Sequence, residues 1–257
     1  MTDHRGTFVW FELMSANVDA ANAFYEALLG WKPQDAGNPA MKYTIMNVGD
    51  RGIAGTFGMS TEACAAGGKA SWSGFIAVDD VDAKARRIVE LGGAVTKGPM
   101  DIPGIGRFAR VTDPQGAPFL IFKPVPPAGA VPATLPSSTH GVIAWHELHA
   151  KDWTQAWPFY EELFNWTKST AVDMGPMGTY QLFKTSAGDE IGGMMTSPMA
   201  PSWLYYASVA NIDEAIEKAK QLGGKTMNGP HEVPGGVWTV QVSDPEGVMF
   251  AMVGPRK

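Results

Sequence analysis

Two glutamates stand next to tryptophans in two closely similar segments, and they are the clearest candidates for chemistry. Trp10-Phe11-Glu12-Leu13 recurs later in the chain as Trp145-His146-Glu147-Leu148. A carboxylate that is partly removed from water can accept a proton near neutrality or anchor a donor group of a ligand. Glu12 and Glu147 are therefore the predicted catalytic residues, acting as general bases or as ligand anchors.

A structural role for the same two carboxylates stays open. A glutamate near the end of a strand can accept a hydrogen bond from a backbone amide or pair with a nearby cation. In the first segment, Arg107 and Arg110 are the cations considered for that pairing.

Aromatic side chains are the candidates for the walls of the site, because small-molecule pockets are mostly apolar with few polar groups. Side chains alternate along a strand, so Trp10 shares a face with Glu12, and Trp145 shares one with Glu147 and His149. The alternative is that these aromatics only fill the core. The predicted ligand-binding residues are Trp10, Trp145, Trp72, Trp203, Tyr206 and His149.

The remaining reactive residues form no recognisable cofactor or metal constellation. His149 shares a strand face with Glu147 alone, which is fewer than the three protein ligands that a zinc site normally has. The single Cys64 is predicted to be an exposed loop thiol without a neighbouring base. No glycine-rich segment carries the lysine of a phosphate-binding loop. We therefore predict no cofactor.

The chain is an internal repeat, and this fixes its organisation. Besides the tryptophan–glutamate segments, Phe24–Trp31 recurs as Phe159–Trp166, and Asp113-Pro114-Gln115-Gly116 recurs as Asp244-Pro245-Glu246-Gly247. A proline-rich stretch without periodicity separates the two copies, as expected of a linker. The predicted domains are residues 1–124 and 139–257, joined by a linker at 125–138.

The spacing of apolar residues and the positions of capping residues and glycines predict the elements of the first half of each copy. In the first copy, residues 8–13 read as a strand, followed by a helix that Asn17 caps and Gly30 ends. Residues 43–48 and 53–59 read as a hairpin across a glycine-containing turn.

The same order then restarts within the copy. A strand is expected at residues 72–78, a helix after Asp79 or Asp80 that ends at Gly92-Gly93, and strands at 108–111 and 118–122. Each copy is thus predicted to contain two βαβββ halves, and the fold class is α+β.

These segments resemble the vicinal-oxygen-chelate superfamily, the group of glyoxalases, bleomycin resistance proteins and extradiol dioxygenases. The resemblance is carried by Phe24-Tyr25-Glu26 with Gly30-Trp31, by Ala77-Val78-Asp79-Asp80, and by the Asp-Pro-x-Gly turns. It implies two tandem domains, each with two βαβββ modules whose sheet curves around a ligand cavity. Tandem domains that open with Trp-x-Glu-Leu also resemble a glyoxalase-like subgroup.

The metal ligands of the superfamily are not matched. The corresponding positions hold Trp10, Ser73 and Leu120 in the first copy and Trp145, Leu204 and Ala251 in the second. A divalent metal needs imidazole, carboxylate or comparable donors, which indole and aliphatic groups do not supply. We therefore predict no metal at these positions.

Composition limits the partners. The 257 residues are 45% hydrophobic and 18% charged, with a net charge of −6. Without a basic stripe or a long apolar run, neither nucleic acid nor membrane is an expected partner. The single cysteine and the absence of a signal-peptide pattern favour a cytoplasmic location. The sequence leaves a homodimer open.

Three functions follow from these residues. The first is a binding protein that encloses a small apolar or aromatic molecule in its domain cavities. The second is an enzyme, either a glyoxalase-like lyase or a metal-free isomerase or hydrolase acting on a reactive carbonyl compound, with Glu12 or Glu147 as the base. The third is a scaffold whose cavities are filled by its own side chains. Because similar folds host many chemistries, the resemblance alone cannot select one. The unmatched metal ligands favour binding, and we rank binding or metal-free chemistry first.

Overall fold

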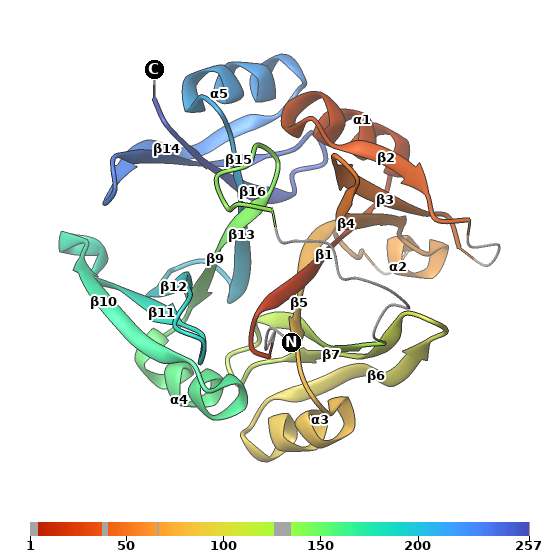
Figure 1. Ribbon diagram of the computed structural model, residues 1–257, viewed down its shortest axis with the longest axis vertical. Helices are drawn as coiled ribbons and strands as arrows, with labels where there is room; N and C mark the ends of the chain where they lie inside the picture. The colour runs from red at the N-terminus through yellow and green to blue at the C-terminus, as the bar shows by residue number, and fades with distance from the viewer. Residues whose placement is uncertain (1–4, 38–40, 66, 126–134, 257) are drawn as a thin grey trace. The chain divides into compact units, whose positions relative to one another are not determined.

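The computed structural model describes residues 5–37, 41–65, 67–125 and 135–256 (Figure 1). It confirms the predicted α+β class: four βαβββ modules follow one another along the chain. Residues 126–134, which hold most of the predicted linker, lie outside the described residues.

The four modules have the following elements. Module 1 consists of β1 (Phe8–Ser15), α1 (Val18–Leu29), β2 (Lys32–Asp35), β3 (Tyr43–Val48) and β4 (Arg51–Gly58). Module 2 consists of β5 (Ser71–Ala77), α3 (Val81–Glu90), β6 (Ala94–Ile102), β7 (Gly106–Thr112) and β8 (Pro118–Pro124). Module 3 consists of β9 (Ile143–Ala150), α4 (Trp153–Phe164), β10 (Thr167–Asp173), β11 (Thr179–Lys184) and β12 (Glu190–Thr196). Module 4 consists of β13 (Ser202–Ser208), α5 (Ile212–Gln221), β14 (Lys225–Val233), β15 (Val237–Ser243) and β16 (Met249–Gly254).

Each sequence copy forms one mixed eight-stranded sheet. The strand order is β2-β3-β4-β1-β5-β8-β7-β6 in the first copy and β10-β11-β12-β9-β13-β16-β15-β14 in the second. The pairs β1–β4, β5–β8, β12–β9 and β13–β16 are parallel, and the outer strands pair antiparallel. The same order in both copies confirms that the repeat in the sequence is a repeat of structure.

The helices begin and end where their capping residues predict. Asn17 accepts a hydrogen bond from the amide of Ala20, and Asp80 accepts one from the amide of Ala83. Gly30 ends α1 in the left-handed conformation (φ 69°), which glycine adopts without strain. Each cap sets the start of a helix whose apolar side then packs against the strands of its own module, as α3 does on β6, β7 and β8.

The chain divides into two compact units, each built from half of each copy. Unit 1 comprises Met1–Trp10, Ser73–Val131 and His146–Leu204, and unit 2 comprises Phe11–Trp72, Pro132–Trp145 and Tyr205–Lys257. Modules 2 and 3 therefore supply most of unit 1, and modules 1 and 4 most of unit 2.

The repeated sequence motifs meet inside these units. In unit 2, the hydroxyl of Tyr25 donates to Oδ2 of Asp244 at 3.1 Å. In unit 1, the equivalent Tyr160 donates to Oδ2 of Asp113 at 3.0 Å. Oδ1 of each aspartate accepts two amide hydrogen bonds in its own turn, at 2.8–2.9 Å. Each motif tyrosine thus ties a helix of one copy to a turn of the other.

Some elements differ from the sequence predictions. The outer strands β2 and β6 were not predicted, and their residues are mostly exposed. Cys64 lies in the short helix α2 (Thr61–Ala65) rather than in a loop, and its thiol is free and exposed, as predicted. A one-turn 3-10 helix (Gly175–Met177) precedes β11. No helix within the described ranges is long and apolar enough to cross a membrane.

Candidate functional site

Glu12 is held by a tyrosine from a neighbouring part of its own sheet. The hydroxyl of Tyr43, at the start of β3, donates to Oε1 of Glu12 at 2.9 Å. Between them lies Gly55 on β4, which is the register partner of Glu12. A Cβ at Gly55 would overlap the Tyr43 hydroxyl, so only glycine lets the ring cross the strand to reach the carboxylate. The pair is partly exposed, so Glu12 remains accessible to a small molecule.

The second copy repeats the packing of a tyrosine ring on a glycine beside the glutamate, and it adds a histidine. Gly193 is the register partner of Glu147, and a Cβ there would overlap the ring of Tyr180. Nε2 of His149 lies 2.8 Å from Oε1 of Glu147, although not at the angle of a hydrogen bond. Both side chains are buried, with relative exposures of 5% and 7%. The structure therefore brings together Glu147 and His149, as the shared strand face predicted.

His149 also presents a buried polar atom with nothing to bind. Among the described residues, its Nδ1 has no hydrogen-bond partner. A buried polar nitrogen left without a partner costs about 1–3 kcal/mol, which is why such groups are rare in folded proteins. A polar group of a bound molecule would remove that penalty.

Tyr43 and Tyr180 were not among the site residues predicted from the sequence. Each lies at the beginning of the third strand of its module, and each is followed by a glycine of the fourth strand on which its ring rests. The signal was available, because both tyrosines and both glycines recur between the copies. It was weak because one intervening turn differs in length.

The tryptophans predicted to bind a ligand lie in two kinds of surroundings. Trp10 and Trp145 are partly exposed on the central strands β1 and β9. Trp72 is buried in unit 2 and donates from Nε1 to the Tyr25 hydroxyl at 3.0 Å. Trp203 is buried in unit 1, edge-on to Tyr160 with ring centroids 5.5 Å apart. Of the four, Trp10 and Trp145 are thus the better placed to touch a ligand.

Tyr206 is buried in unit 2 on β13. Nε2 of Gln241 approaches its hydroxyl at 3.5 Å, at the outer limit of a hydrogen bond. Its register partner is Ala251, one of the positions at which the family resemblance implies a metal ligand.

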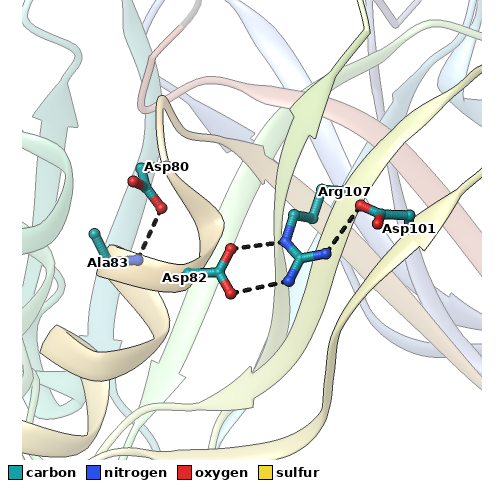
Figure 2. Close-up of polar contacts among 5 residues, drawn as sticks. All are labelled: Asp80, Asp82, Ala83, Asp101 and Arg107. Carbon is teal, nitrogen blue, oxygen red and sulfur yellow. Dashed lines mark hydrogen bonds and ion pairs between the residues drawn. The ribbon is translucent and has the colours of Figure 1, made fainter.

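Arg107 is not the partner of Glu12. Its guanidinium binds both oxygens of Asp82 at 2.7 and 2.9 Å and Oδ1 of Asp101 at 2.9 Å (Figure 2). This hydrogen bonding lowers the pKa of Asp82, which lies in the first turn of α3. Among the described residues, no hydrogen bond or ion pair joins Arg110 to Glu12 either. Tyr43 is a hydrogen-bond partner of the glutamate.

His146 lies on the other face of β9 from Glu147. Its ring stacks on Phe8 with centroids 4.1 Å apart. Nδ1 donates to the carbonyl oxygen of Ile191 at 2.7 Å. Burial lowers the pKa of His146 to about 4, so the imidazole is neutral at pH 7 and serves the core rather than proton transfer.

The residues at the superfamily's metal positions do not fit a metal. Ser73 and Leu120 of β5 and β8, and Leu204 and Ala251 of β13 and β16, offer at most one hydroxyl oxygen. Within the described part of the chain, no three histidine, cysteine, aspartate or glutamate side chains gather as a ligand set. The donor chemistry thus differs from that of a divalent metal centre.

One open depression lies away from the predicted residues. It has a volume of about 300 Å³ and is lined by residues near Arg107 and Lys123. None of the predicted site residues borders it.

Comparison with known proteins places these features in context. The family model described as Glyoxalase/Bleomycin resistance protein/Dioxygenase superfamily matches residues 7–121 and 142–252. The protein named "Putative glyoxylase CFP32" of Mycobacterium tuberculosis is 32% identical over 257 residues, covering 98% of this chain and 95% of that protein. The "Anthracycline biosynthesis protein DnrV" of Streptomyces peucetius is 28% identical over 268 residues, covering 98% and 94%.

Two solved structures share the fold at low sequence identity. The Mn(II)-bound glyoxalase from Novosphingobium aromaticivorans has a TM-score of 0.68 at 15% identity, covering 99% of this chain and 83% of that one. The 2,3-dioxygenase LapB from Pseudomonas sp. KL28 has a TM-score of 0.65 at 12% identity, covering 98% and 92%. These likenesses establish the fold alone.

Proposed function

The chain belongs to the glyoxalase/bleomycin resistance protein/dioxygenase superfamily, and from this premise we propose that it binds a small planar aromatic molecule without a metal ion. The observation that carries the proposal is the exchange of donors for apolar groups at the superfamily's metal positions. Indole rings stand there on β1 and β9, and aliphatic side chains stand on β8, β13 and β16. Such surfaces favour stacking and apolar contact over metal coordination.

Two further observations support a ligand with polar groups at its edge. The carboxylate of Glu12 is accessible beside Tyr43, and the buried Nδ1 of His149 lacks a partner among the described residues. In unit 1, a polar substituent of a planar ligand would give Nδ1 of His149 the partner that it lacks among the described residues. In unit 2, a donor group of a ligand would be anchored by the carboxylate of Glu12. The likeness to an anthracycline biosynthesis protein over nearly the whole chain favours a polycyclic aromatic compound of this kind.

Isothermal titration calorimetry with the neutral probe 2-naphthamide tests the proposal. We expect measurable binding that is unchanged after dialysis against EDTA. Trp10→Ala and Trp145→Ala should each weaken it, and Trp153→Ala on α4 is the matched control that should not. Absence of heat in every titration, or binding that appears only after Mn²⁺ is added, would overturn the proposal.

An enzymatic role is the second candidate, favoured by the buried Glu147–His149 contact. A carboxylate and an imidazole at 2.8 Å can pass a proton between them. In the reaction considered, Glu147 takes the proton from a hydroxyl-bearing carbon beside a carbonyl group and returns it to the carbonyl carbon, while the hydroxyl proton passes to the former carbonyl oxygen. The hydroxyl becomes the new carbonyl group and the old carbonyl becomes the new hydroxyl. No electron leaves the substrate, so this isomerisation needs no redox cofactor.

Turnover of methylglyoxal with glutathione, measured with and without added Ni²⁺, Zn²⁺, Mn²⁺ and Fe²⁺, separates the two candidates. Metal-independent turnover that Glu147→Gln abolishes would support the enzyme. Turnover that requires a metal would contradict both metal-free functions. Because this substrate represents one reaction class, other carbonyl compounds are tested in the same format.

A further inference from the structure

The half of the first sheet that belongs to unit 1 carries an aromatic surface on the side away from its helix. Ala109 and Val111 of β7 are fully buried, and Arg107 on the same side binds Asp82 of α3 (Figure 2). The alternate residues of β7 therefore face the other way. We define the aromatic face by Phe75, Phe108, Leu120 and Phe122.

Register and ring contacts show that these four residues form one surface. Phe75 pairs with Leu120, and Phe108 pairs with Phe122 across adjacent strands. The Phe75 ring lies 5.8 Å from that of Phe122 and 6.4 Å from that of Phe108. Phe108 and Phe122 are partly exposed, whereas Phe75 and Leu120 are buried, so a ligand would reach the surface at Phe108 and Phe122.

Arg110 stands at the edge of the aromatic face as an unpaired cation. It is the register partner of Leu120 and is partly exposed. Among the described residues, its guanidinium has neither an ion pair nor a hydrogen bond. Arg107, three residues earlier, has all its charge engaged by Asp82 and Asp101. The exposed Lys97, the register partner of Arg110 on β6, adds a second positive charge.

In the equivalent half of the second sheet, in unit 2, neutral side chains that can form hydrogen bonds stand at the positions of these two cations. The row Tyr206, Ala251, Gln241 replaces the row Phe75, Leu120, Arg110. Asn228 pairs with Gln241 where Lys97 pairs with Arg110. The two copies therefore differ in charge at the same place of the fold.

We propose that the aromatic face and Arg110 form a subsite for an anionic aromatic ligand, such as an aromatic carboxylate, and that the second copy has no such preference. The inference rests on the proposed function and narrows its ligand class. The ring would lie on the phenylalanines, and the carboxylate would accept two hydrogen bonds from the guanidinium, the geometry that arginine favours. Among the described residues, no carboxylate forms an ion pair with Arg110 that a ligand would have to displace.

A matched pair of probes tests this subsite. 2-Naphthoate and 2-naphthamide share size and shape but differ in charge at neutral pH. Calorimetry with the 257-residue chain is expected to give naphthoate about tenfold tighter binding, the range of one charge-assisted hydrogen bond at a partly exposed site. Arg110→Gln, which installs the residue type found in the second copy, should remove that preference by lowering the affinity for naphthoate to that for naphthamide.

Two further variants keep the test specific. Arg107→Gln removes an equal charge from the opposite face of the same strand and should leave the preference intact. Gln241→Arg should create a second naphthoate-preferring site. If the wild type binds both probes with equal affinity, the subsite proposal is wrong, but the proposed binding of aromatic molecules is not contradicted. No binding of either probe would overturn the proposed function, and the subsite with it.

Discussion

The hydroxyl of Tyr25 and the carboxylate of Asp244 lie 3.1 Å apart although 219 residues separate them in the chain. Both belong to motifs that occur twice, and the second tyrosine, Tyr160, makes the same bond to Asp113. Burial raises the pKa of Tyr25 and of both aspartates. The two bonds thus explain why these short motifs recur together.

Removing the Tyr25 hydroxyl should destabilise the protein. Tyr25→Phe leaves Oδ2 of Asp244 and Nε1 of Trp72 buried without this partner, so we expect a loss of about 1–3 kcal/mol in the free energy of unfolding. Urea denaturation followed by tryptophan fluorescence measures it. Tyr160→Phe in unit 1 is the matched comparison, and a midpoint unchanged in both variants would contradict the prediction.

Acid should weaken the fold through His146. Its pKa is about 4 in the folded state against 6.5 for an ordinary histidine, so the unfolded chain binds the proton first as pH falls. This stabilising contribution is complete above pH 6.5 and is lost between pH 6.5 and 4, amounting to about 3 kcal/mol. Denaturation curves across this pH range measure the free energy of unfolding of the wild type and of His146→Phe. The free energy of unfolding should fall less in the variant as the pH is lowered.

The glycine under Tyr43 should not tolerate a side chain. Gly55→Ala must push the Tyr43 ring aside and break its bond to Glu12, at a cost of about 1–3 kcal/mol. Gly58→Ala on the same strand is the control, because its Cβ would come no closer than 3.8 Å to Val18. Thermal denaturation of the two variants compares them, and equal melting temperatures would refute this account of Gly55.

Much of the fold was predictable because its signals are local. Asn17, Gly30 and Asp80 act on their own helix ends, so the sequence located α1 and α3 closely. The outer strand β2 was missed because its four residues are all exposed and include a proline, and no alternation marks a strand that buries neither face. Such polar outer strands also resist pairing with other chains.

The candidate site was predictable only in part. Alternation along β9 correctly placed Glu147 with His149, because neighbours on one strand need no tertiary information. The Tyr43–Glu12 bond depends on the register of three strands, which composition does not reveal. The same holds for Arg107, whose partner is decided by the position of α3 over β7.

A fragment of the first copy should associate with itself. Residues 1–124 contain Tyr25 and Asp113 but neither of their partners, Asp244 and Tyr160. Asp113 is the repeat equivalent of Asp244, and Tyr25 is the repeat equivalent of Tyr160. In a pair of fragments, Tyr25 of each fragment can therefore donate to Asp113 of the other. Light scattering after size-exclusion chromatography is expected to show a dimer that Tyr25→Phe weakens. A stable folded monomer would be incompatible with this interpretation.

The composition of the two units also sets an order for biosynthesis. All of unit 1 precedes residue 205, so its segments have left the ribosome while synthesis of the chain is still in progress. Unit 2 combines Phe11–Trp72 with Tyr205–Lys257, and its first segment must wait for the last one to be translated. During that interval the nascent protein exposes the face of α1 that later packs on module 4, and we expect this to be the stage at which it is most prone to aggregation.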